Sequence, residues 1–133
     1  MIEKPEGNYL GVVTPDDRKI LSPDENGKLA LNPERMRINY AKNLASRQTM
    51  RDFFVNEGLL VDDSQIRTMA VDKIIIRYRD FTDEGWLFMK SQAVGKWLGS
   101  CDRKGTIEAY SNYDGLKKRL VKFRAAAIEN VHH

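Results

Sequence analysis

The chain has 133 residues, of which 41% are hydrophobic and 31% charged, and its formal net charge is +3. This composition is typical of one folded domain with its own core. The single cysteine, Cys101, excludes an intramolecular disulfide, so we expect a reducing compartment, the cytoplasm. The polar N-terminus predicts no signal peptide, and no apolar run is long enough to predict a membrane span.

The first part of the chain predicts a flexible N-terminus, residues 1–8, and then three short strands. Residues 9–13, 19–21 and 28–31 carry the apolar positions, and turn signals such as Asn26-Gly27 separate them. Strands this short are only marginally stable alone. We therefore expect an antiparallel meander that packs on helices.

A long helical stretch follows the predicted meander. Asn32 and Pro33 form a strong helix start, and Gly58 is the expected stop. The apolar positions slip in phase near Ser46. The sequence therefore leaves open whether residues 33–57 form one bent helix or two helices that meet at this point.

The second half of the chain predicts a strand and two further helices. Residues 71–79 include three successive isoleucines, which favour a strand with both faces covered. Thr82 is the predicted cap of a helix that ends at Gly99 and buries one face. Shorter strands are expected at residues 59–61 and 106–110.

The last predicted helix begins at Ser111 and carries an apolar stripe that includes Leu116 and Leu120. Together these elements predict an α+β domain over residues 9–128, in which a small antiparallel sheet packs on three to four helices. Residues 129–133 are expected to form a flexible tail.

The sequence offers little for catalysis. The two histidines, His132 and His133, are the last residues, and they are either native or the remnant of a purification tag. Triads and Cys-His dyads need an imidazole, and no histidine lies within the predicted domain, while a Cys/His zinc site needs more ligands than Cys101 alone. Three acidic pairs lie in turns or in a helix first turn, where backbone chemistry favours them: Asp16/Asp17, Asp62/Asp63 and Asp83/Glu84. We predict no catalytic residue, no metal and no cofactor.

Basic residues are the most informative polar feature. Nine of them are predicted to bind nucleic acid: Arg47, Arg51, Arg77, Arg79, Lys117, Lys118, Arg119, Lys122 and Arg124. Nucleic-acid sites combine such charges with planar side chains, and Tyr78 lies between two of these arginines. The alternative interpretation is that these residues only solvate the outer faces of helices.

The motif order after the first long helix is Gly58-Leu59-Leu60, a strand at residues 74–79, and then Phe81-Thr82-Asp83-Glu84-Gly85. Over residues 33–99 it resembles the winged-helix DNA-binding domain of the multiple-antibiotic-resistance regulators. The resemblance implies a recognition helix with Arg47, Gln48, Thr49 and Arg51. It also implies a wing with Arg67, Lys73, Arg77 and Arg79 on or beside it.

Three functional hypotheses follow from these observations. The first is a small non-enzymatic cytoplasmic regulator that binds nucleic acid through its basic surface. The second is a protein-interaction module, an inhibitor, adaptor or regulatory subunit, with Trp86 and Trp97 as candidate anchors. The third is an enzyme that uses carboxylates or a lysine, which needs a cleft where ionisable groups converge. We predict the first, with protein as the alternative partner, no membrane partner, and the oligomeric state open.

Overall fold

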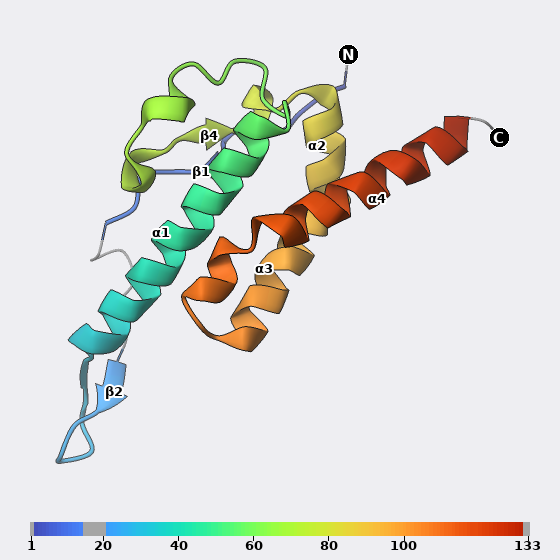
Figure 1. Ribbon diagram of the computed structural model, residues 1–133. Coiled ribbons are helices and arrows are strands. Elements are labelled where there is room, and N and C mark those ends of the chain that lie inside the picture. The colour runs from blue at the N-terminus through green and yellow to red at the C-terminus, as the bar shows by residue number, and fades with distance from the viewer. Residues whose placement is uncertain (1, 15–20, 132–133) are drawn as a thin grey trace.

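The computed structural model describes residues 2–14 and 21–131, with side chains through residue 128. The described residues form four α-helices and two two-stranded antiparallel sheets, which confirms the α+β class (Figure 1). The elements in chain order are β1 (Asn8–Leu10), β2 (Leu21–Pro23), β3 (Leu29–Leu31), α1 (Pro33–Asn56), η2 (Ile66–Thr68), η3 (Val71–Lys73), β4 (Ile76–Arg77), η4 (Tyr78–Asp80), α2 (Asp83–Lys90), α3 (Ala93–Lys104), η5 (Glu108–Ser111) and α4 (Tyr113–Val131), where η marks a 3₁₀ turn.

Residues 33–56 form one continuous helix, α1, and not two helices. Its start is capped as the sequence predicts, because the Asn32 side chain accepts a hydrogen bond from the Arg35 N–H at 3.1 Å. The chain turns away after α1 at Gly58, whose φ of +70° lies in the left-handed region that glycine tolerates.

The strands pair differently from the predicted meander. β2 pairs with β3, but β1 pairs with β4, with Asn8 opposite Arg77. β1 joins β4 because Tyr9 makes edge contacts with Phe54 and Phe81 and so anchors β1 on the core. Most of the second predicted strand, residues 19–21, lies outside the described residues, which begin again at Leu21.

The predicted strand at residues 71–79 is reduced to Ile76–Arg77, with 3₁₀ turns on both sides. The Asp80 carboxylate accepts a hydrogen bond from the Arg77 N–H at 2.8 Å, and this local contact closes η4 in place of further strand. The predicted strand at 59–61 contributes an isolated bridge, Leu60 to Phe81. The described residues therefore do not form the two-stranded wing that the resemblance implies, and the family resemblance itself stays a prediction.

The helix predicted between Thr82 and Gly99 is two helices, α2 and α3. Thr82 caps α2 as predicted, but the chain breaks at Gln92, whose φ is +68°. The predicted stop at Gly99 is wrong, because α3 continues to Lys104 and buries Cys101. The Cys101 thiol donates to the Ala109 carbonyl, and burial raises its pKa.

The region before α4 also differs from the prediction. Residues 108–111 form the 3₁₀ turn η5 where a strand was expected. Asn112, and not Ser111, accepts the hydrogen bond from the Gly115 N–H at the start of α4, at 3.0 Å.

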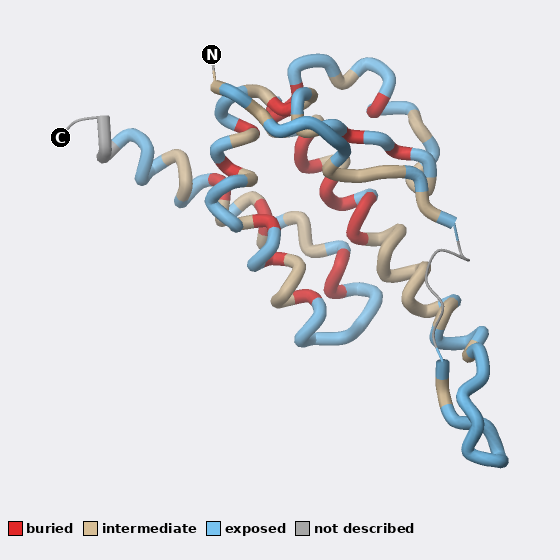
Figure 2. The backbone as a smooth tube through the Cα atoms, turned by 180° about the vertical axis from the view of Figure 1, so that it is seen from behind, coloured by how far each residue is buried: buried red, intermediate tan, exposed pale blue. Residues whose placement is uncertain are grey.

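The core lies where the second half of α1 meets α2, α3 and α4. Phe53, Phe88, Trp97, Leu116 and Leu120 are among its fully buried side chains. Both views show two parts that extend beyond this core: the β2–β3 hairpin with the first half of α1, and the C-terminal end of α4 (Figure 2). The molecule thus has one packed region and two projecting ends.

Candidate nucleic-acid interface

Arg47 lies inside the protein and not on an accessible face. It is 3% exposed, and its guanidinium donates to the carbonyls of Val71 at 2.9 Å and Ile74 at 2.7 Å. Burial lowers its pKa, and the nearby Asp72 carboxylate opposes that shift. The prediction of a phosphate contact at Arg47 is therefore wrong in this fold. The residue instead satisfies two backbone carbonyls in the segment that precedes β4.

The other predicted cations of α1 and the wing segment are mostly engaged within the protein. Arg51 donates to the Met69 carbonyl at 2.7 Å. Arg77 forms an ion pair with Asp80 at 3.1 Å. Arg67, implied by the resemblance, pairs with Asp63 at 2.9 Å. Arg79 is exposed on η4, with no ion pair within 4.0 Å among the described residues.

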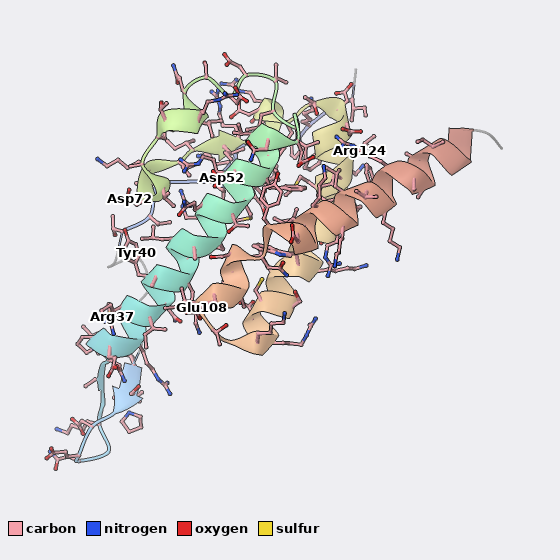
Figure 3. All side chains as sticks on the ribbon, viewed as in Figure 1. Arg37, Tyr40, Asp52, Asp72, Glu108 and Arg124 are labelled. Atoms are coloured by element: carbon pink, nitrogen blue, oxygen red, sulfur yellow. The ribbon has the colours of Figure 1, made fainter. Side chains whose placement is uncertain are left out.

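Lys117 and Arg124 lie on the inner side of α4, which faces α1 and α2. Lys117 pairs with Glu57 at 2.5 Å. Arg124, which Figure 3 labels on α4, pairs with Glu84 of α2 at 2.7 Å. Glu57 also accepts a hydrogen bond from the Tyr113 hydroxyl at 2.7 Å. The positive charge of this side of the helix is therefore neutralised by carboxylates.

Burial and two hydrogen-bond partners act in opposite directions on the pKa of the Glu57 carboxyl. Burial raises its pKa, but the hydrogen bonds from Lys117 and Tyr113 outweigh burial and hold the pKa below its ordinary value. Burial, together with the hydrogen bond to Glu57, raises the pKa of Tyr113 to about 12. The carboxylate is therefore the stable form over the whole neutral range.

The remaining three predicted cations of α4 lie on a different side of the helix. We call Lys118, Arg119 and Lys122 the outer stripe. Lys122 lies four residues after Lys118 and three after Arg119, so it shares a side of the helix with both. Lys118 and Lys122 are exposed and Arg119 is partly exposed. None of the three has an ion pair within 4.0 Å in the described part of the chain. The structure thus brings three of the nine predicted residues together as uncompensated charge.

A cleft of about 550 Å³ lies against the face of α1 that looks toward β1, α3 and η5, and the sequence did not reveal it. Its lining includes Tyr9, Lys42, Asn43, Asp102 and Tyr110. The Asn43 Oδ1 atom is buried there and has no hydrogen-bond partner among the described residues. Four separate elements supply this lining, so no motif in the sequence could mark it.

The cleft meets the geometric condition of the enzyme hypothesis, since several ionisable side chains converge on it. The chemistry of these side chains is less suitable for catalysis near neutral pH. The Tyr110 hydroxyl donates to the Asp102 carboxylate, and burial raises the pKa of Tyr9 to about 12, so its phenol stays protonated near neutral pH. Over the residues that the structure describes, no group of three or more His, Cys, Asp or Glu side chains is placed to hold a metal.

The tryptophans predicted as anchors differ in exposure. Trp97 is buried, and its indole N–H donates to the Asn112 carbonyl at 2.9 Å. Trp86 is partly buried and makes an edge contact with Tyr78. Trp97 therefore belongs to the core and offers no anchor to a partner.

Comparison of the chain with protein-family models, with curated proteins and with solved structures finds no match. Within residues 2–14 and 21–131, no helix combines the length and the apolar character needed to cross a membrane.

Proposed function

We propose that this protein binds nucleic acid without catalysing a reaction, through the outer stripe of α4. The observation that supports this proposal is the division of charge on one helix. The inner cations Lys117 and Arg124 are paired with Glu57 and Glu84, whereas the outer stripe faces no carboxylate at ion-pair distance in the described residues. Unpaired cations on a helix face can bind phosphates and release their counterions.

The outer stripe suits contacts with the nucleic-acid backbone rather than with bases. Lys118 and Lys122 are four residues apart, or about 6 Å along a helix axis, so the three side chains can reach two or three neighbouring phosphates. Phosphate contacts carry no direct sequence information. We therefore expect weak, salt-dependent binding with little sequence preference, of the kind an accessory or regulatory protein provides.

Fluorescence anisotropy with a labelled DNA duplex and a labelled single-stranded RNA tests this proposal. The wild-type protein is expected to bind at low salt, with a slope of log K against log salt of about −2 to −3 for three phosphate contacts. The triple variant K118A/R119A/K122A is expected to lose most of the binding.

The matched control removes the same charge elsewhere. Lys73, Arg79 and Lys104 are exposed cations on other elements, and K73A/R79A/K104A is expected to retain most of the binding. Absence of binding by the wild type at low salt would remove the proposal. Loss of binding in the control variant alone would assign the contact to the segment that resembles a wing, on which two of its residues lie.

The second candidate function is the protein-interaction module. The observation that favours it is the β2–β3 hairpin, where Leu21, Leu29 and Leu31 are 53%, 66% and 53% exposed. Clustered apolar side chains on a projecting element are typical of binding surfaces. Nucleic acid remains our first proposal because the outer stripe is polar and positively charged, and the hairpin leads to a separate inference.

A further inference from the structure

The β2–β3 hairpin has an apolar face with no cover among the described residues. Leu21 lies opposite Leu31, and Pro23 lies opposite Leu29. Because side chains alternate between the two faces of a sheet, the three leucines share one face. Both views show the hairpin extending past the start of α1, away from α3 and α4 (Figures 1 and 2). A two-stranded hairpin of this length is marginally stable alone, so a partner strand would stabilise it.

The hydrogen-bond pattern shows which edge of the hairpin is open. The Asp24 N–H donates to the Lys28 carbonyl at 2.8 Å, so these two residues form a hydrogen-bonded pair. Pairs alternate along an antiparallel ladder. The pair of Ser22 and Ala30 is therefore hydrogen-bonded, and the pairs that contain the leucines are not.

Residues of the non-hydrogen-bonded pairs direct their backbone groups outward. On β2 this edge includes Pro23, which has no N–H to donate. On β3 it presents the N–H and carbonyl groups of both Leu29 and Leu31, a complete edge for another strand. The open edge of the hairpin is therefore the outer edge of β3.

We propose that the outer edge of β3 pairs with the same edge of a second copy of this chain. The two β3 strands would run antiparallel about a two-fold axis at Ala30, with Leu29 opposite Leu31 of the second copy. An isologous contact of this kind is self-complementary. The product is a four-stranded sheet in which the leucines of both copies form one continuous apolar face.

The charges near the hairpin favour a second copy of this chain as the partner of the β3 edge. In this register the hairpin tip, where Asp24 and Glu25 outnumber the one cation, Lys28, comes to the start of α1 of the second copy. Arg35 and Arg37 are exposed there, against one carboxylate, Glu34. A helix N-terminus also carries partial positive charge. The two-fold axis therefore brings opposite charges together at both ends of the new strand pair.

Disulfide trapping tests the register. In the proposed dimer the two Ala30 residues form a non-hydrogen-bonded pair, with Cα atoms about 4.5 Å apart, which lies within disulfide range. A30C is therefore expected to form a covalent dimer under mild oxidation, seen by non-reducing electrophoresis. Cys101 is buried, so the wild-type chain is expected to remain uncrosslinked.

S22C is the matched control, because Ser22 faces Ala30 within one hairpin but lies on the outer strand of the proposed sheet. Its two copies would be three strand spacings apart, about 14 Å, beyond disulfide reach. Equal crosslinking of A30C and S22C would overturn the proposal, and so would the absence of crosslinking in A30C.

Sedimentation of the unmodified chain supplies the second measurement. The wild type is expected to show a concentration-dependent dimer. L29K/L31K is expected to weaken dimerisation by at least tenfold, or about 1.4 kcal/mol, with the circular dichroism of the helical body unchanged. L87K alters another exposed leucine, on α2, and is expected to dimerise as the wild type does. A wild type that stays monomeric at all concentrations overturns the inference.

Discussion

Arg47 of α1 and Lys118 of α4 are both basic residues on long helices, but their surroundings are opposite. Arg47 is buried and donates to two backbone carbonyls, at 2.9 and 2.7 Å. Lys118 is exposed and has no ion pair in the described residues. The difference shows that a basic residue becomes structural wherever the fold brings carbonyls or carboxylates to it. Positive charge remains available to a partner only where the fold brings none.

The largest expected effect comes from Arg47→Met, which tests the structural side of this comparison. The substitution keeps an apolar stem but leaves the Val71 and Ile74 carbonyls without a donor. Unsatisfied buried groups cost about 1–3 kcal/mol each, so we expect the free energy of unfolding to fall by about 2–4 kcal/mol. Urea denaturation followed by circular dichroism measures this change.

Arg79→Met is the matched control for Arg47→Met. Arg79 is exposed on η4, and surface substitutions change stability by about 0.5 kcal/mol or less. Equal effects of the two substitutions would show that the hydrogen bonds of Arg47 do not stabilise the contact between α1 and the segment before β4.

A second contrast within the packed region uses two helical glycines. A Cβ atom at Gly85 would meet the Leu59 backbone oxygen closer than real Cβ contacts allow, whereas a Cβ atom at Gly95 would make an ordinary contact, at 3.6 Å, with the Gln92 side-chain oxygen. We expect Gly85→Ala to destabilise the protein by about 1–3 kcal/mol. Gly95→Ala is expected to stabilise it by about 0.5–1 kcal/mol, because alanine has the higher helix propensity.

Thermal unfolding of the two glycine variants supplies the measurement. Melting temperatures that move in opposite directions are expected. A Gly85→Ala variant as stable as the wild type would mean that α2 does not lie directly against the Leu59 backbone.

Local signals in the sequence were sufficient for several elements. Asn32 caps α1 and Thr82 caps α2 as predicted, since a cap depends on residues that are close in sequence. The stripe of Leu116 and Leu120 is buried as periodicity indicates. These features need no knowledge of the rest of the fold.

Features that depend on distant or backbone partners could not be predicted. β1 joins β4 across more than sixty residues, with Asn8 opposite Arg77. The break at Gln92 has a left-handed φ without glycine. The acceptors of Arg47 are backbone carbonyls, which every residue carries, so no residue type in the sequence marks them. For the same reason the sequence marks nine basic residues as candidates but does not show which of them have a carboxylate or carbonyl partner in the fold.

Glu57, at the end of α1, is the carboxylate that neutralises Lys117 on the inner side of α4. Glu57→Gln keeps the shape but removes the charge that Lys117 and Tyr113 bind. Hydrogen bonds to charged groups contribute about 1.5–3 kcal/mol and partly exposed ion pairs less. We therefore expect a loss of about 1–2 kcal/mol at pH 7.

The pH dependence of this loss follows from the sign of the shift. The folded-state pKa of Glu57 is lowered, so the unfolded chain binds more protons and the contribution of Glu57 is lost as pH falls. This stabilisation is fully present above the ordinary pKa of glutamate, about 4.3, and it disappears as the pH falls through the lower folded-state pKa. Urea unfolding of both proteins between neutral pH and pH 3 should show the difference shrinking in that window. A constant difference would contradict the assignment.

The smallest expected effect compares two basic residues of α4. Arg119→Glu removes a like charge three residues before Lys122 and creates a Glu–Lys pair in the favourable order, and Gly115 and Leu116 carry no charge on its N-terminal side, so we expect a gain of about 0.2–0.5 kcal/mol that salt reduces. Lys117→Glu instead places a second carboxylate beside Glu57, and we expect a loss of about 1 kcal/mol. Chemical denaturation at low and high salt measures both. The two variants have the same net charge, so opposite signs can arise only from their different sides of the helix, and equal signs would mean that the outer stripe is not free of carboxylates.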